Sequence, residues 1–140
     1  MTGLKLEDLS IGQSAERSHT VTEATIAAFA EVSGDHNPVH LDAAFAATTT
    51  FKERIAHGML SAAYISAVLG NDLPGPGAIY LSQTLTFRRP VRIGDVVVAR
   101  VTVAAIDEDK ARVTLSTVCE VAGKAVVQGE AVIMVARRDA

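Results

Sequence analysis

The sequence predicts an α+β fold in which one buried helix packs against an antiparallel sheet. The stretch Ile55–Gly70 is apolar on nearly every side of a helix and is interrupted by Ser61 and Ser66, so it should be buried on most sides. After it, apolar and polar residues alternate in four runs that are separated by short turns. These predicted strands are Ile79–Phe87, Val96–Ala105, Ala111–Val121 and Lys124–Ala136. Short connections between strands favour antiparallel pairing.

The chain before the buried helix begins with a strand and a helix. A short polar strand is expected at Ala15–His19. Thr20 and Glu23 have the spacing of a capping box, which predicts a helix over Val21–Val32. Gly34 follows that helix and is expected to end it.

The segment that follows, Val32–Asp42, is expected to be a tight and irregular loop. Pro38 lacks an N–H and pushes Asn37 toward extended conformations, so no helix is expected to run through it. Asp42 is then expected to cap a short helix over Ala43–Thr48.

The composition is that of an ordinary globular chain. With 140 residues, 49% of them hydrophobic, it can form one domain with a proper core. A net charge of -3 and a pI near 5.8 argue against a protein that grips nucleic-acid phosphates broadly. Met1–Ser10 lacks a basic start followed by an apolar run, and the apolar helix is too short to span a bilayer. We therefore expect a cytoplasmic protein whose partners include neither nucleic acid nor membrane.

Cysteine and histidine placement predicts neither a disulfide nor a metal site. The single cysteine, Cys119, cannot form an internal disulfide, which favours a reducing compartment, and its apolar strand favours a buried structural thiol. The four histidines lack the spacing of a zinc site; they are His19, His36, His40 and His57. No Gly-rich phosphate loop is present either, so we expect no metal and no cofactor.

The candidate chemistry lies in the loop after the first helix. Asp35 and His40 are proton-transfer groups five residues apart, and a folded loop can aim both at one point. An imidazole and a carboxylate that share a water form an acid/base apparatus. The alternative is structural: Asp35 would bond neighbouring backbone N–H groups and His40 would be solvated.

The residues around this pair form a longer pattern. They are Phe29, Val32, Ser33, Gly34, Asp35, Asn37, Pro38, Val39, His40 and Ala46. This pattern resembles the signature of R-specific enoyl-CoA hydratases and MaoC-like dehydratases at all ten positions. The resemblance continues through His57-Gly58-Met59 and through the segment from Phe87 to Asp95, which carries a strand–turn pattern common in the same fold.

The resemblance implies a hotdog fold, in which a curved antiparallel sheet wraps around a central helix. It identifies residues 1–140 as a single MaoC-like hotdog hydratase domain. It also implies a homodimer whose two sheets join edge to edge, which would cover an otherwise exposed edge strand.

The resemblance also assigns catalytic roles. Asp35 and His40 would hold the attacking water, and the residues leave open which of them is the base because the pair can titrate as a unit. The backbone N–H of Gly58 would form the oxyanion hole, at a helix start where unpaired N–H groups converge. The alternative is that His57 merely caps the helix and Gly58 eases a turn.

Substrate-binding roles are assigned in the same way. By resemblance, Asn37 and Ser66 would lie near the substrate, while Leu69 and Val132 would line the acyl pocket. Ser66 can instead bond back to its own helix, and any apolar residue here can be plain core. The cations expected to meet an acidic carrier such as coenzyme A are Lys52, Arg54, Arg88, Arg89 and Arg92.

The implied function is a hydro-lyase of fatty-acid or polyester-monomer metabolism that needs no cofactor. It would add water reversibly to trans-2-enoyl-CoA and give (3R)-3-hydroxyacyl-CoA. The alternatives are a dehydratase acting on acyl carrier protein, a hotdog thioesterase, and a non-catalytic acyl-binding module. A thioesterase commonly carries a carboxylate on the central helix, and Ile55–Gly70 has none. A module without catalysis would be expected to lack Asp35 or His40.

Overall fold

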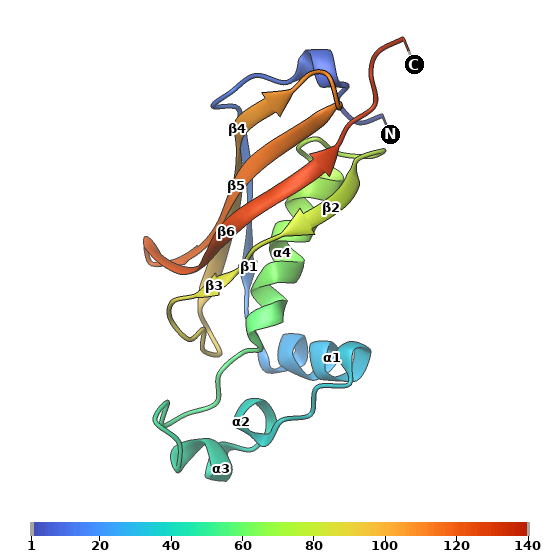
Figure 1. The fold of residues 1–140 in the computed structure, drawn as a ribbon. Coiled ribbons are helices and arrows are strands. Elements are labelled where there is room, and N and C mark those ends of the chain that lie inside the picture. The colour runs from blue at the N-terminus through green and yellow to red at the C-terminus, as the bar shows by residue number, and fades with distance from the viewer. Residues whose placement is uncertain (1, 140) are drawn as a thin grey trace.

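The computed structural model describes residues 2–139, which form one antiparallel sheet and a set of helices (Figure 1). The strands are β1 (Ser14–Thr20), β2 (Ile79–Gln83), β3 (Thr86–Phe87), β4 (Val96–Asp107), β5 (Arg112–Val121) and β6 (Lys124–Met134). They pair in the order β1-β4-β5-β6-β2, and β3 pairs with β6. The antiparallel pairing expected from the short connections is confirmed.

The longest helix lies on the face of the sheet, and three of the other helices gather at one of its ends (Figure 1). The helices are η1 (Leu6–Asp8), α1 (Glu23–Ser33), α2 (Pro38–Leu41), α3 (Ala43–Ala47) and α4 (Gly58–Asn71). In Figure 1, α4 runs along the sheet, whereas α1, α2 and α3 gather beyond its first turn. No helix among the described residues is both long and apolar enough to cross a membrane.

The core lies between α4 and the inner face of the sheet. On β5, Val113, Leu115 and Cys119 are fully buried, and the Cys119 thiol donates to the carbonyl of Ser61 on α4 at 3.4 Å. Burial raises the pKa of this thiol to about 12, so it remains protonated at neutral pH. The expectation of a buried structural thiol is confirmed.

One side of α4 is exposed, although its apolar sequence predicts burial on most sides. Met59, Ala63, Ser66 and Gly70 follow one another at intervals of three and four residues and therefore share a helix face. All four are exposed, and Met59 is 54% exposed. Within this chain, α4 therefore presents a surface stripe of small and apolar residues.

The start of α1 differs from the expected capping box. Thr22, not Thr20, is the cap: its hydroxyl accepts the N–H of Thr25 at 3.1 Å, and Thr25 returns the bond to the Thr22 N–H at 3.2 Å. Thr20 is instead the last residue of β1, where it pairs with Val96. Thr20 is therefore part of a strand pairing, although the local pattern predicted it as the helix cap.

Two further boundaries were placed wrongly from the sequence. Pro38 begins the short helix α2, because its missing N–H costs nothing at a first helical position. The central helix begins at Gly58 instead of Ile55, because Ile55 forms a bridge with Arg92 and the Ala56 N–H bonds to the backbone carbonyl of Val91.

Candidate active site

The turn that carries Asp35 is held by local hydrogen bonds. Gly34 ends α1 in the left-handed conformation, with φ 79°, and its N–H bonds to Ala30. The Ser33 hydroxyl accepts the Asp35 N–H at 3.1 Å. Asp35 in turn accepts the Asn37 N–H through Oδ1, also at 3.1 Å. Asp35 is exposed, and its Oδ2 accepts no hydrogen bond from residues 2–139, so the structural role of Asp35 in the turn and a chemical role are compatible.

His40 lies on α2 and is 7% exposed. Its Nδ1 is 2.8 Å from the carbonyl of Ile55, and a carbonyl only accepts, so Nδ1 carries the hydrogen. The neutral ring therefore has its lone pair on Nε2, the atom that can take a proton from a bound water. Burial is the main cause that lowers the pKa of His40, although the bond to Ile55 and the charge of Asp35 oppose it. His40 is therefore not the solvated residue of the structural alternative.

His57 joins Asp35 and His40, although no role beside this pair was predicted for it from the sequence. Its ring is 2% exposed and stacks on the ring of His40, with 3.8 Å between the centroids and 29° between the planes. Its Nε2 is 2.9 Å from the backbone carbonyl of Asp35, so Nε2 carries the hydrogen. It is the N-cap residue of α4, but its side chain makes no cap bond, so the ring is not used to cap the helix.

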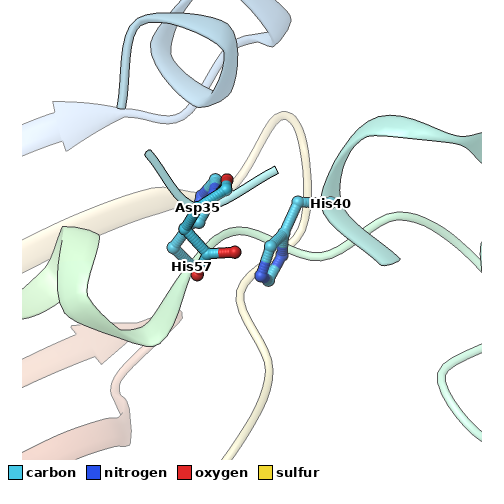
Figure 2. Close-up of side chains that lie close together, drawn as sticks. All are labelled: Asp35, His40 and His57. Carbon is cyan, nitrogen blue, oxygen red and sulfur yellow. The ribbon is translucent and has the colours of Figure 1, made fainter. Parts of the chain in front are cut away.

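These three side chains meet in space although they come from three separate segments (Figure 2). Asp35, His40 and His57 each offer one atom within 4.8 Å of the others, and the Asp35 carboxylate points toward the His40 ring. The planes of the two stacked rings differ by 29°, so their in-plane lone pairs do not converge readily on one shared ion. The free Oδ2 of Asp35 and Nε2 of His40 are instead suited to hold and deprotonate a water.

Gly58 supplies free N–H donors beside this cluster. Among residues 2–139, neither the Gly58 N–H nor the Met59 N–H is hydrogen-bonded, and both point from the first turn of α4, the positive end of its dipole. A cavity of about 330 Å³ opens here, lined by Gly58, His57, Phe87 and Arg88 among others. A Cβ on Gly58 would lie 2.6 Å from the ring of Phe87, so a side chain here would crowd the approach to the donor.

The residues assigned to substrate binding do not all meet. Ser66 lines a groove of about 550 Å³ between α4 and β2, together with Phe29, Met59 and Leu81. Leu69 is 2% exposed and belongs to the core behind this groove.

Asn37 and Val132 have other placements. The Asn37 side chain accepts the Val39 N–H at 3.1 Å and so caps α2, between Asp35 and His40 in the chain. Val132 alternates with the buried Ala131 and Ile133, which pair with the core-facing side of β5, so it lies on the sheet face turned away from α4. The structure therefore does not place Val132 beside Leu69.

Three of the expected carrier-binding cations are engaged within the chain. Arg54 pairs with Glu23 at 2.5 Å, and its Nε donates to the carbonyl of His40 at 2.8 Å. Arg92 pairs with Glu53 at 2.5 Å. Arg89 donates to a backbone carbonyl of β6, and it lines the cavity beside Gly58 with Arg88.

Comparison with known proteins agrees with this geometry. The family model described as "MaoC like domain" matches residues 9–128. The chain is 56% identical over 132 residues to the (R)-specific enoyl-CoA hydratase of Rhodospirillum rubrum, covering 94% of this chain and 92% of the relative. It is 46% identical over 136 residues to the 3-hydroxybutyryl-CoA dehydratase of Methylorubrum extorquens, covering 97% of this chain and 87% of the relative.

A solved structure gives the same result for the fold. The unliganded R-hydratase PhaJ1 of Pseudomonas aeruginosa superposes with a TM-score of 0.91 at 52% identity, covering 97% of this chain and 88% of that one. The expected hotdog arrangement of a curved sheet around a central helix is thereby confirmed.

Proposed function

The chain belongs to the MaoC-like domain family, and from this premise we propose that it is a hydro-lyase that interconverts trans-2-enoyl-CoA and (3R)-3-hydroxyacyl-CoA. One observation carries the proposal. Asp35, His40 and His57 each offer one atom within 4.8 Å of the others, and His57 is followed directly by Gly58, whose N–H has no hydrogen-bond partner among residues 2–139. Acid/base groups and an oxyanion donor are what water addition to an unsaturated thioester requires.

The reaction follows from these groups. The thioester oxygen accepts the Gly58 N–H, and the negative charge that develops on this oxygen makes the β-carbon electrophilic. A water held between Asp35 and His40 loses a proton to the pair while its oxygen bonds to the β-carbon. A proton from the pair then reaches the α-carbon, so that water is added without net change in the enzyme. Because both groups lie on one side of the bound substrate, addition occurs on a single face.

We assign the groove along α4 to the acyl chain. Its walls are mainly apolar, and Ser66, the last α4 residue that lines it, marks one end of its helical side. Leu69 follows Ser66 by three residues, and helical side chains lean toward the N-terminus, so Leu69 backs the groove near Ser66 from within the core. Asn37 supports the site by capping α2, and Val132 is outside the groove of this protomer.

We assign the cavity beside Gly58 to the thioester and its carrier. Arg88 and Arg89 lie at this cavity and can meet the phosphates of coenzyme A. Acyl carrier protein bears the same thioester on a phosphopantetheine arm. The preference between the two carriers is therefore measured by comparing rates on substrates with the same acyl chain.

We further propose that two copies associate through β2. The outer edge of β2 is unpaired among the described residues, and Ile79, Tyr80 and Leu81 are exposed on it. A second β2 would satisfy this edge and would cover the exposed stripe of α4 next to it. We place the enzyme in the cytoplasm, where fatty-acid metabolism supplies enoyl-CoA and where the lone buried thiol of Cys119 needs no partner.

A hydration assay tests the activity. Crotonyl-, hexenoyl- and decenoyl-CoA are each mixed with enzyme, the loss of the enoyl absorbance is followed, and the chirality of the product is determined. The proposal predicts rapid hydration to the (3R) alcohol, and the matching acyl-carrier-protein thioesters measure carrier preference. A (3S) product, or hydrolysis of the thioester in place of hydration, would contradict it.

A further inference from the structure

His57 is almost completely buried between the catalytic groups and touches each of them differently. Its Nε2–H donates to the backbone carbonyl of Asp35 at 2.9 Å. Its ring stacks on that of His40 at 3.8 Å, with Phe29 on the ring as well at 4.9 Å. Its own carbonyl carbon forms the peptide bond to Gly58, the proposed oxyanion donor.

We infer that His57 is a positioning residue, which sets the Asp35 turn and the His40 ring against the first turn of α4 through its Nε2–H bond and its ring stack. The inference rests on the proposed hydratase activity. It adds to that activity a residue that fixes the acid/base pair and the oxyanion donor relative to one another without touching the reacting atoms.

The polar anchor of the His57 ring is a single bond. The Nδ1 atom is buried and has no hydrogen-bond partner among residues 2–139, so only Nε2 fixes the rotation of the ring. The Asp35 end of this bond lies in an exposed turn whose remaining anchors are local, within a few residues of Asp35. The bond from His57 is therefore the long-range contact that ties the turn to α4, across 22 residues of sequence.

The His40 side is held by a second set of contacts. The Nδ1–H of His40 bonds to the Ile55 carbonyl. Arg54, which pairs with Glu23, donates to the backbone carbonyl of His40. These bonds fix the edge and the backbone of His40, but the face of its ring rests on His57. A displacement of about 1 Å within such a constellation can cost roughly 10²-fold in rate.

Two variants separate the bond from the stack. In His57→Gln, the side-chain amide nitrogen is the same number of bonds from Cα as Nε2, so the donor to Asp35 is kept and the ring is lost. In His57→Phe, the ring is kept and the donor is lost. We use His36→Phe as the control, because His36 is an exposed histidine in the same turn whose ring bonds, within the described part of the chain, only to the Gly34 carbonyl.

Initial rates on crotonyl-CoA and thermal unfolding midpoints are measured for all variants. We expect His57→Phe to lose roughly 10- to 100-fold in kcat with KM changed less than about 3-fold, because geometry and not substrate affinity is lost. His57→Gln should recover at least part of that loss, and His36→Phe should match the wild type. A folded His57→Phe variant with wild-type kcat, or a loss that appears only in KM, would overturn the inference.

A readout without turnover keeps the test independent of the proposed function. In a long-range ¹H–¹⁵N spectrum of the uniformly labelled protein, the neutral His57 ring should carry its hydrogen on Nε2 and the neutral His40 ring on Nδ1. The His57→Gln and His40→Gln variants identify the signals. A His57 ring protonated on Nδ1 would overturn the inference whatever the activity, whereas a wild-type enzyme without hydratase activity but with these tautomers would refute only the proposed function.

Discussion

Leu69→Ala tests how the acyl groove ends, because the same substitution should change both stability and chain-length preference. Leu69 is 2% exposed, and its replacement by alanine removes about three carbon atoms from a packed site. The lost transfer free energy and the residual cavity together should lower the free energy of unfolding by about 2–5 kcal/mol.

The substrate effect can be worked from the same geometry. Leu69 leans toward Ser66, which lines the groove, so the new cavity should open into it. If two further methylenes of an octenoyl chain enter, each contributes up to about 0.8 kcal/mol. The ratio of kcat/KM for octenoyl-CoA over crotonyl-CoA should therefore rise by up to roughly 15-fold, at 1.36 kcal/mol for each tenfold.

Val68→Ala is the matched control. Val68 is fully buried on α4 and lies about 160° around the helix from Ser66, so its cavity should open away from the groove. It should lose stability by urea unfolding but leave the ratio near the wild-type value. If Leu69→Ala loses stability while its ratio also stays unchanged, Leu69 is core only and the proposed groove end is wrong.

Further outcomes are expected for the oxyanion donor, for the catalytic pair and for the β2 edge. Replacing the amide of Gly58 by an ester removes the proposed oxyanion donor and should raise the barrier by about 2–4 kcal/mol in single-turnover hydration; an unchanged rate would exclude the role. Burial, the main cause, lowers the pKa of His40 in the folded enzyme, so kcat/KM should be flat near pH 7 and fall as the pH drops through that lowered pKa, below about 6.5. Asp35→Asn removes a charge that raises this pKa, so the acidic limb of kcat/KM should move to lower pH, and a shift to higher pH would contradict the assignment. Leu81→Lys places a charge on the exposed β2 edge and should convert the proposed dimer to monomer in sedimentation experiments, and a dimer that persists would place the interface elsewhere.

The features that depend on local chemistry were predictable from the sequence. The apolar run that became α4 and the turn residues around Asp35 signal their structures within a few residues, and Gly34 ends α1 as expected. Asp35 and His40 were predicted to approach each other, and the structure brings them together.

The features that depend on distant pairing were not predictable. Thr20 and Thr22 both have cap-like spacing, and pairing of Thr20 with Val96 decides between them. The stack of His57 on His40 joins residues that are 17 positions apart, and no local sequence pattern predicts this contact.

The sheet face on which Val132 lies could not be predicted for a related reason. β6 carries apolar residues on both faces, so alternation alone does not say which of them face the core. Register shifts at its pairings with β2 and β5 add a further change of phase that the sequence does not reveal.

Asp35 and His40 should act as one catalytic unit, and a double-mutant cycle on crotonyl-CoA hydration tests this most directly. Asp35→Asn keeps Oδ1 for the Asn37 N–H and so keeps the turn, while His40→Gln removes the imidazole. Each single variant should lose roughly 10²-fold or more in kcat while unfolding near the wild-type midpoint. The double variant should be scarcely slower than the slower single variant, because members of one unit are not additive. Losses that multiply, or a folded single variant with near-normal turnover, would contradict the account.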